Sequence, residues 1–203
     1  MKSFIRLTDY KKSELLEIFQ IADSIDKYDG FLKGKTVIMF FPASSIRTRV
    51  SFEKGIYLLG GQTILFDPAT LDKKEDIRDV CGYIQNWADA VIVRHRDISM
   101  LEIMANTLSI PVVNAMTDEN HPCEIMSDLY TLSKIRTDYL RDNYLFVGAD
   151  GNIGRAWEEA AEAFGFCLNP CPPFYRGEEV TEEVIDSDYF IGYEFKQSLL
   201  KVQ

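Results

Sequence analysis

Residues 35–61 read KTVIMFFPASSIRTRVSFEKGIYLLGG, and this stretch decides the fold. Its first part, Lys35–Phe41, is an apolar run of the kind found in strands that are buried on both faces of a sheet. After Ser45 the apolar residues recur at helical spacing, and the pair Gly60-Gly61 is a stop signal for that helix. A buried strand followed at once by a helix predicts the repeating unit of a parallel α/β sheet.

The same alternation continues along the chain. Further strands are expected at Thr63–Phe66, Ala90–Val93, Pro111–Asn114 and Tyr144–Val147, and helices at Leu7–Ile25 (capped by Thr8 or Ser13), Lys73–Trp87, Met100–Leu108, Cys123–Ile135 and Arg155–Phe164. This order predicts an α/β fold, with a parallel sheet flanked by helices on both sides.

The polar stretch 136–142 predicts a boundary between two units. We expect a first domain at residues 1–137 and a shortened second α/β domain, Rossmann-like, at residues 138–203. In the second unit, a loop is expected at 169–177, a short helix at 180–187 and a strand at 188–195. A glycine run begins at Gly148, but its spacing is GxxGxxG and no acidic residue ends the strand that follows. The run is therefore weak evidence for a nicotinamide cofactor.

Composition limits the classes of function. The chain has 203 residues, of which 46% are hydrophobic and 27% charged, as is typical of a globular protein. Its net charge of −10 argues against a nucleic-acid partner but leaves room for a local basic pocket. The four cysteines match neither a disulfide framework nor a paired zinc motif, so we expect no metal and no cofactor. The first 25 residues do not resemble a signal peptide, and no apolar run is long enough to span a bilayer. We expect a cytoplasmic protein without a membrane partner.

Three polar clusters follow three of the expected strands, at the sheet edge where parallel α/β proteins bind ligands. They are Ser45-Ile46-Arg47-Thr48-Arg49, Val93-Arg94-His95-Arg96-Asp97 and Glu119-Asn120-His121-Pro122-Cys123-Glu124. The first cluster opens a helix, where N–H groups and guanidinium groups favour an anion. The alternative is a serine cap followed by surface arginines. For the second cluster alone, a salt-bridged loop is about as good an interpretation.

These motifs, taken together, resemble the aspartate/ornithine carbamoyltransferase family, and the ornithine type most closely. The resemblance rests on Ser45-x-Arg47-Thr48-Arg49, Ser51-Phe52-Glu53, Arg94 and His121-Pro122-Cys123, in that order, and it covers about residues 1–165. It implies that the protein binds carbamoyl phosphate and transfers the carbamoyl group to an amine such as ornithine.

The resemblance also implies a role for each site residue. Ser45, Ile46 (through its backbone) and Arg47 would hold the phosphate. Thr48, Arg94 and His121 would donate to the carbonyl oxygen as it becomes an oxyanion. Lys73 or Lys74 would enter the site of a neighbouring subunit in a homotrimer, and Asn152 would contact the second substrate.

Two departures from the family pattern stand out. Glu124 occupies a position where Gln is usual; it can still accept from the carbamoyl NH₂, but its charge opposes the phosphate unless Arg94 or Arg96 neutralises it. The loops that grip the amino-acid substrate in ornithine-type enzymes have no counterpart here. Two functions therefore remain: a carbamoyltransferase, or a non-catalytic paralogue or subunit that binds carbamoyl phosphate.

Overall fold

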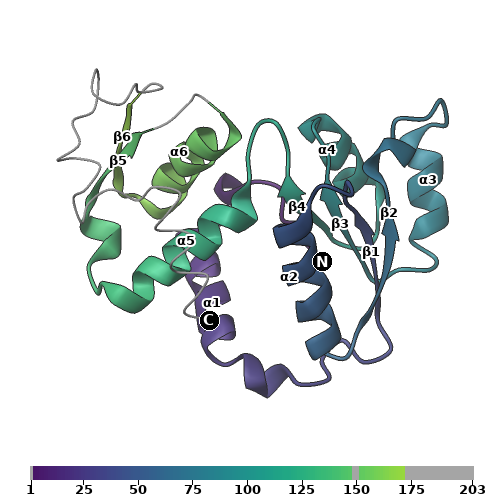
Figure 1. The fold of residues 1–203 in the computed structure, drawn as a ribbon, viewed down its shortest axis with the longest axis horizontal. Helices are drawn as coiled ribbons and strands as arrows, with labels where there is room; N and C mark the ends of the chain where they lie inside the picture. Colours follow the sequence, from purple (N-terminus) through teal and green to yellow (C-terminus); the bar gives the residue numbers. More distant parts are fainter. Residues whose placement is uncertain (1, 148–150, 172–203) are drawn as a thin grey trace.

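The computed structural model describes residues 2–147 and 151–171. Its main sheet has four parallel strands in the order β2-β1-β3-β4. Their bounds are Thr36–Phe40 (β1), Gln62–Phe66 (β2), Ala90–Arg94 (β3) and Val112–Met116 (β4). Helices lie on both faces of this sheet (Figure 1), so the predicted fold class is confirmed.

Alternating side chains of β1 pack against different helices. The helices concerned are α2 (Ile46–Leu58), α3 (Ile77–Ile84) and α4 (Ile98–Thr107). Ile38 and Phe40 belong to a core that contains residues of α3 and α4. Val37 and Met39 pack on the other face of the sheet, on the side of α2. Because successive side chains in a strand point to opposite faces, a strand covered on both sides must be apolar throughout. The prediction of a fully buried strand here is confirmed.

The connections create a crevice between β1 and β3. From β1 the chain passes through α2 to β2 at one edge, whereas from β3 it passes through α4 to β4 at the other edge. Neighbouring strands whose connections leave in opposite directions form a switch point, and ligands of open α/β sheets bind there, beyond the carboxyl ends. The fold thus brings the first two polar clusters to one place.

A second core lies beside the first. It is built from α1 (Lys12–Asp23), α5 (Pro122–Ile135), α6 (Asn152–Phe164) and the parallel pair β5 (Asn143–Val147) and β6 (Cys167–Cys171). Leu15, Leu129 and Phe164, from three different helices, are fully buried in it. Residues from both sides of position 137 contribute to this core (Figure 1). The division into domains at 137 stays a prediction.

The first expected helix is interrupted. Leu7–Asp9 and Ile25–Tyr28 are 3₁₀ turns, and only Lys12–Asp23 between them is α-helical. The expected caps were wrong, because the N-cap is Lys11, whose backbone N–H donates to Glu14 Oε2 at 2.7 Å. A glutamate three residues beyond the cap satisfies this N–H without a serine or threonine.

The helix expected at Lys73–Trp87 was also too long. It begins at Ile77, after Asp76, whose carboxylate accepts from the backbone N–H of Arg78 at 2.9 Å. Residues 72–76 are exposed and polar, so no apolar face holds them in a helix. The stop at Gly60 was correct: α2 ends at Leu58, and Gly60 has φ +85°, a conformation that favours glycine.

The loop expected from residue 169 was wrong at its start, because β6 continues to Cys171 and pairs with β5 along its length. The helix expected at 180–187 and the strand at 188–195 lie outside the described residues. Within residues 2–147 and 151–171, no helix is both long enough and apolar enough to cross a membrane.

Candidate functional site

Ser45 and Arg94 meet at the switch point. Ser45 is buried, and its Oγ accepts a hydrogen bond from Arg94 Nη1 at 3.0 Å. Although Ser45 is the N-cap residue of α2, its side chain makes no cap hydrogen bond. Ser45 is thus the N-cap residue, as the alternative interpretation expects, but its side chain bonds to Arg94 and does not cap the helix. The first turn of α2 keeps backbone N–H groups that a capping side chain would otherwise satisfy.

The charge around Arg94 is mixed. Arg94 ends β3, where the pairing with β4 shifts register between Val93 and Arg94, and such irregularities redirect side chains. Burial lowers the pKa of Arg94, and the positive charge of Arg47 adds to this effect, whereas the negative charge of Glu124 opposes it. Arg47, Arg94 and Glu124, from three elements, therefore act on one another electrostatically.

The two arginines of the first cluster separate. Arg47 is exposed on the first turn of α2. Arg49 turns along the helix instead, and its Nε donates to Glu53 Oε1 at 3.1 Å. Thr48 is half-buried on the same turn, and Ile46 is 71% exposed, so its side chain is not part of the core. Of the pair that first indicated an anion, only Arg47 is near Arg94.

His121 lies at the start of α5. It is 3% exposed and serves as the N-cap residue, with Pro122 as the first residue of the helix, as the sequence predicted. Its Nε2 lies 3.2 Å from Glu124 Oε2, three residues further on. The unusual glutamate therefore contacts the histidine that the resemblance places at the carbonyl oxygen.

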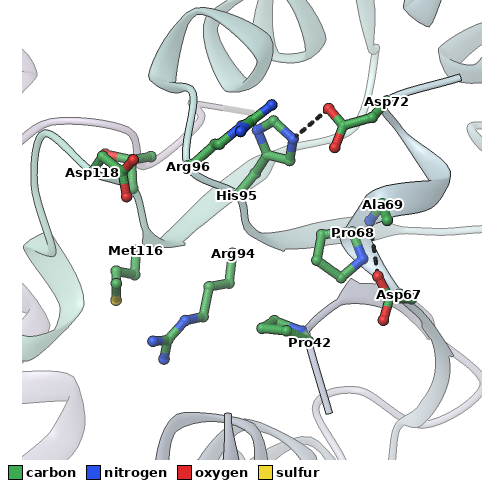
Figure 2. Close-up of a pocket in the computed structure, with 11 residues that line it drawn as sticks. Pro42, Asp67, Pro68, Ala69, Asp72, Arg94, His95, Arg96, Met116 and Asp118 are labelled. Atoms are coloured by element: carbon green, nitrogen blue, oxygen red, sulfur yellow. Dashed lines mark hydrogen bonds and ion pairs between the residues drawn. The ribbon is translucent and has the colours of Figure 1, made fainter. Parts of the chain in front are cut away.

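The sequence did not predict the pairing of His95. Figure 2 shows Arg94 and His95 leaving the end of β3 in different directions. His95 is buried, its Nδ1 accepts from the backbone N–H of Asp97, and its Nε2 lies 3.1 Å from Asp72 Oδ1. Nε2 therefore carries the proton and donates to Asp72. His95 is thus held within the loop by a hydrogen bond to Asp72 and is not part of a salt bridge, whereas Arg94 faces the site.

A pocket of about 350 Å³ opens beside Arg94 at the carboxyl ends of the strands (Figure 2). Its lining includes Pro42 after β1, Asp67 after β2, Arg96 after β3 and Asp118 after β4. The pocket therefore draws on all four strand ends, and of the described residues expected to bind carbamoyl phosphate it is lined by Arg94 alone.

The remaining expected residues lie further out. Lys73 and Lys74 are exposed on the loop between Leu71 and Ile77, two buried residues that fix its ends. Asn152 is on the first turn of α6, and its Nδ2 donates to the backbone carbonyl of Thr117 at 2.7 Å. Asn152 thus contacts the loop that leads to His121.

Comparison with known proteins agrees with this geometry. The sequence profile described as "Aspartate/ornithine carbamoyltransferase, carbamoyl-P binding domain" matches residues 2–134. The ornithine carbamoyltransferase of Campylobacter fetus is 35% identical over 194 residues, which cover 92% of this chain and 62% of that relative. That of Oleidesulfovibrio alaskensis is 40% identical over 139 residues, 68% of this chain and 46% of that relative.

The fold of the chain also matches that of a solved structure. The anabolic ornithine carbamoyltransferase of Campylobacter jejuni superposes with a TM-score of 0.78 at 27% identity, covering 99% of this chain and 63% of that one. The chain thus spans less than two thirds of the length of these relatives. Because the match extends through both the sheet and the sequence motifs at its edge, the chain belongs to the aspartate/ornithine carbamoyltransferase family.

Proposed function

We propose that this chain binds carbamoyl phosphate beyond β1 and β3 and is part of an enzyme that transfers the carbamoyl group to an amine such as ornithine. The observation that carries the proposal is the Arg94–Ser45 hydrogen bond, which joins the end of β3 to the start of α2. It brings a guanidinium group to a helix N-terminus that no capping side chain closes. A phosphate dianion suits such a place, since the N–H groups and the helix dipole both favour negative charge.

In this proposal the phosphate contacts Ser45, the backbone of Ile46 and Arg47. Thr48, Arg94 and His121 donate to the carbonyl oxygen. When an amine attacks the carbonyl carbon, that oxygen becomes negative, and fixed donors stabilise it in the transition state. The phosphate leaves with the electron pair of the broken C–O bond. The side chains orient the ligand and stabilise charge, and no covalent intermediate with the protein is needed.

A second function is favoured by one observation. His121 Nε2 lies 3.2 Å from Glu124 Oε2, so a carbonyl oxygen must compete with a carboxylate for that nitrogen. A site of this kind can hold the phosphate without stabilising the oxyanion. The chain would then be a non-catalytic subunit or paralogue that binds carbamoyl phosphate.

Calorimetry followed by a product assay separates the two functions. Both predict heat of binding for carbamoyl phosphate, because both keep the phosphate contacts. Only the transferase forms citrulline from ornithine, or carbamoylaspartate from aspartate, on the same preparation. His121→Asn should reduce product formation strongly while phosphate still binds. Absence of binding to carbamoyl phosphate and to inorganic phosphate would overturn both functions.

We also propose a cytoplasmic homotrimer that acts in arginine metabolism. The exposed loop with Lys73 and Lys74 would reach the site of the adjacent subunit and add positive charge there. The proposal is supported by the family to which the chain belongs and by the fixed ends of this loop, Leu71 and Ile77. Lysine on an anchored loop is suited to contact an anion across an interface.

A further inference from the structure

The loop that leads to His121 is organised by one amide, that of Asn120. Asn120 is 2% exposed, and its Oδ1 accepts from Asn114 Nδ2 at 2.7 Å and from Thr117 Oγ1 at 3.0 Å. Its Nδ2 donates to the carbonyl of Ile5 at 3.3 Å. Since a buried amide with several partners has one orientation, Asn120 fixes the backbone directly before His121.

A carboxylate of α6 completes the contacts of this amide. Glu159 Oε1 and Oε2 lie 3.2 Å and 3.3 Å from Asn120 Nδ2, and Oε2 also accepts from the backbone N–H of Leu7 at 3.1 Å. Arg6 Nη1 is 3.8 Å from Oε1. The hydrogen bonds and the ion pair of Glu159 all come from donors, so both of its oxygens act as acceptors, while Asp9 adds a second negative charge nearby.

Two more residues of α6 contact the same loop through its backbone. The carbonyl of Thr117 accepts from Asn152 Nδ2 at 2.7 Å. The carbonyls of Asp118 and Glu119 accept from Arg155 Nη2 at 2.6 Å and from Arg155 Nε at 3.1 Å. Three successive carbonyls of the loop thus accept from side chains of α6.

The three residues lie on one face of the helix. Asn152, Arg155 and Glu159 follow at spacings of three and four, so their side chains project to the same side of α6. Glu158 and Glu162, on the same helix, are exposed. The face toward the loop is polar and specific, whereas the buried face of α6 (Ala156, Ala160, Phe164) packs in the second core.

We propose that Asn152, Arg155 and Glu159 are positioning residues, which set the orientation of His121 through the loop 117–121. In this assignment Asn152 acts on the loop and not on a second substrate, since its Nδ2 already donates to Thr117. The consequence for ligand binding rests on the proposed function, because it requires the carbonyl oxygen of carbamoyl phosphate at His121. Coupling of this kind is reciprocal: a ligand that fixes His121 also stabilises the contact of α6 with the loop.

The test uses the two histidines as reporters, since the chain has only His95 and His121. Their ring C–H signals are recorded by NMR in wild type and in Glu159→Gln, and are assigned with His95→Gln and His121→Asn. Glu159→Gln keeps the size of the side chain but must turn an NH₂ group toward a donor. We expect the His121 signal to shift while the His95 signal stays in place. Carbamoyl phosphate, whose carbonyl oxygen would accept from His121, should bind roughly two- to thirtyfold more weakly to this variant, the range found for residues that couple sites.

Glu158→Gln is the matched control, because it removes the same charge from the same helix without a loop contact. It should leave both the His121 signal and the affinity for carbamoyl phosphate unchanged. If Glu159→Gln fails to fold, Arg155→Gln replaces it, since Arg155 is exposed and its loss removes contacts with two loop carbonyls.

The two proposals fail in different ways. An unchanged His121 signal in Glu159→Gln and Arg155→Gln overturns the positioning role, whatever the affinity for carbamoyl phosphate. Equal shifts in Glu159→Gln and Glu158→Gln overturn it too, since they would show a general effect of charge. A wild type that binds no phosphate contradicts the proposed function, while the signals of His121 without ligand still decide the role of α6.

Discussion

Glu124 distinguishes this site at the scale of single residues. Its carboxylate contacts His121 and acts electrostatically on Arg94, two groups that the proposed function assigns to the carbonyl oxygen. The side chain of Glu124 is 34% exposed, so water screens its charge only in part. The effect of this carboxylate on an anion can therefore be measured by removing its charge.

We expect Glu124→Gln to bind inorganic phosphate and carbamoyl phosphate several-fold more tightly. One negative charge is removed near a dianion, a change of about 1 kcal/mol in an intermediate dielectric. Titrations at two ionic strengths check this, because the difference should shrink as salt is added. Weaker binding by the variant would refute repulsion and show that Glu124 holds Arg94 or His121 in place.

Cys123, two residues after His121, gives a second prediction at this scale. Cys123 Sγ donates to the carbonyl of Asn114 at 3.2 Å, and burial raises the pKa of Cys123 to about 12. Burial also raises the pKa of Cys81, to about 11, whereas Cys167 is exposed. Because the thiolate is the reactive form, iodoacetamide at pH 8 should modify Cys167 and spare Cys81 and Cys123. Peptide mass mapping decides this, and rapid labelling of Cys123 would contradict the structure.

At the scale of elements, the start of α4 is stabilised by one carboxylate. Asp97 Oδ1 accepts from the backbone N–H of Ser99 at 2.9 Å and from its Oγ at 2.7 Å. We expect Asp97→Ala to lower the free energy of unfolding by about 1 kcal/mol, the usual effect of losing a helix cap. Denaturant titration with an unchanged m value checks this.

The pH dependence of this cap has a definite sign. The hydrogen bond from the Ser99 side chain lowers the pKa of Asp97 below its ordinary value. The stabilisation is therefore complete above the ordinary pKa of aspartate and is lost as the pH falls through the lowered pKa. Asp97→Asn can still cap the helix but cannot titrate, so its cap should keep its contribution to stability at low pH. Equal acid sensitivity of Asp97→Asn and wild type would show that the carboxylate does not act in this way.

Some of the helices and strands could be predicted from the sequence alone, and others could not. The strands and the helices after Ser45 and His121 were predictable, because a buried parallel strand is apolar and a helix has its own period. The bounds of α1 and α3 were not predictable. Glu14 and Asp76 cap these helices, but other residues nearby in the sequence could also have served as caps.

The same limit applies to the site. Arg94 and His121 could be singled out from the sequence because Arg94 ends a strand and His121 follows one, at the same edge of the sheet. The pairs His95–Asp72 and Asn120–Glu159 were missed, because they join residues far apart in the sequence and no pattern of spacing marks them.

For the whole molecule, the exposed loop around Lys73 and Lys74 leads to a prediction about assembly. If the chain forms the proposed homotrimer, light scattering at micromolar concentration should report three times the mass of the chain. Closed assembly through repeated contacts is typical of soluble oligomers and needs no further protein. A monomer at that concentration would rule out a shared site with Lys73 or Lys74.

The central claim is an anion site built on Arg47, and thermal unfolding with millimolar phosphate or carbamoyl phosphate tests it most directly. A ligand that binds only the native state at about a hundredfold excess over its Kd adds about 2.7 kcal/mol, or roughly 5–10 °C in Tm for a chain of this size. We predict this rise for wild type and for Arg49→Ala, since Arg49 is paired with Glu53. We predict none for Arg47→Ala. An unchanged Tm in wild type, or an equal rise in Arg47→Ala, would contradict the account.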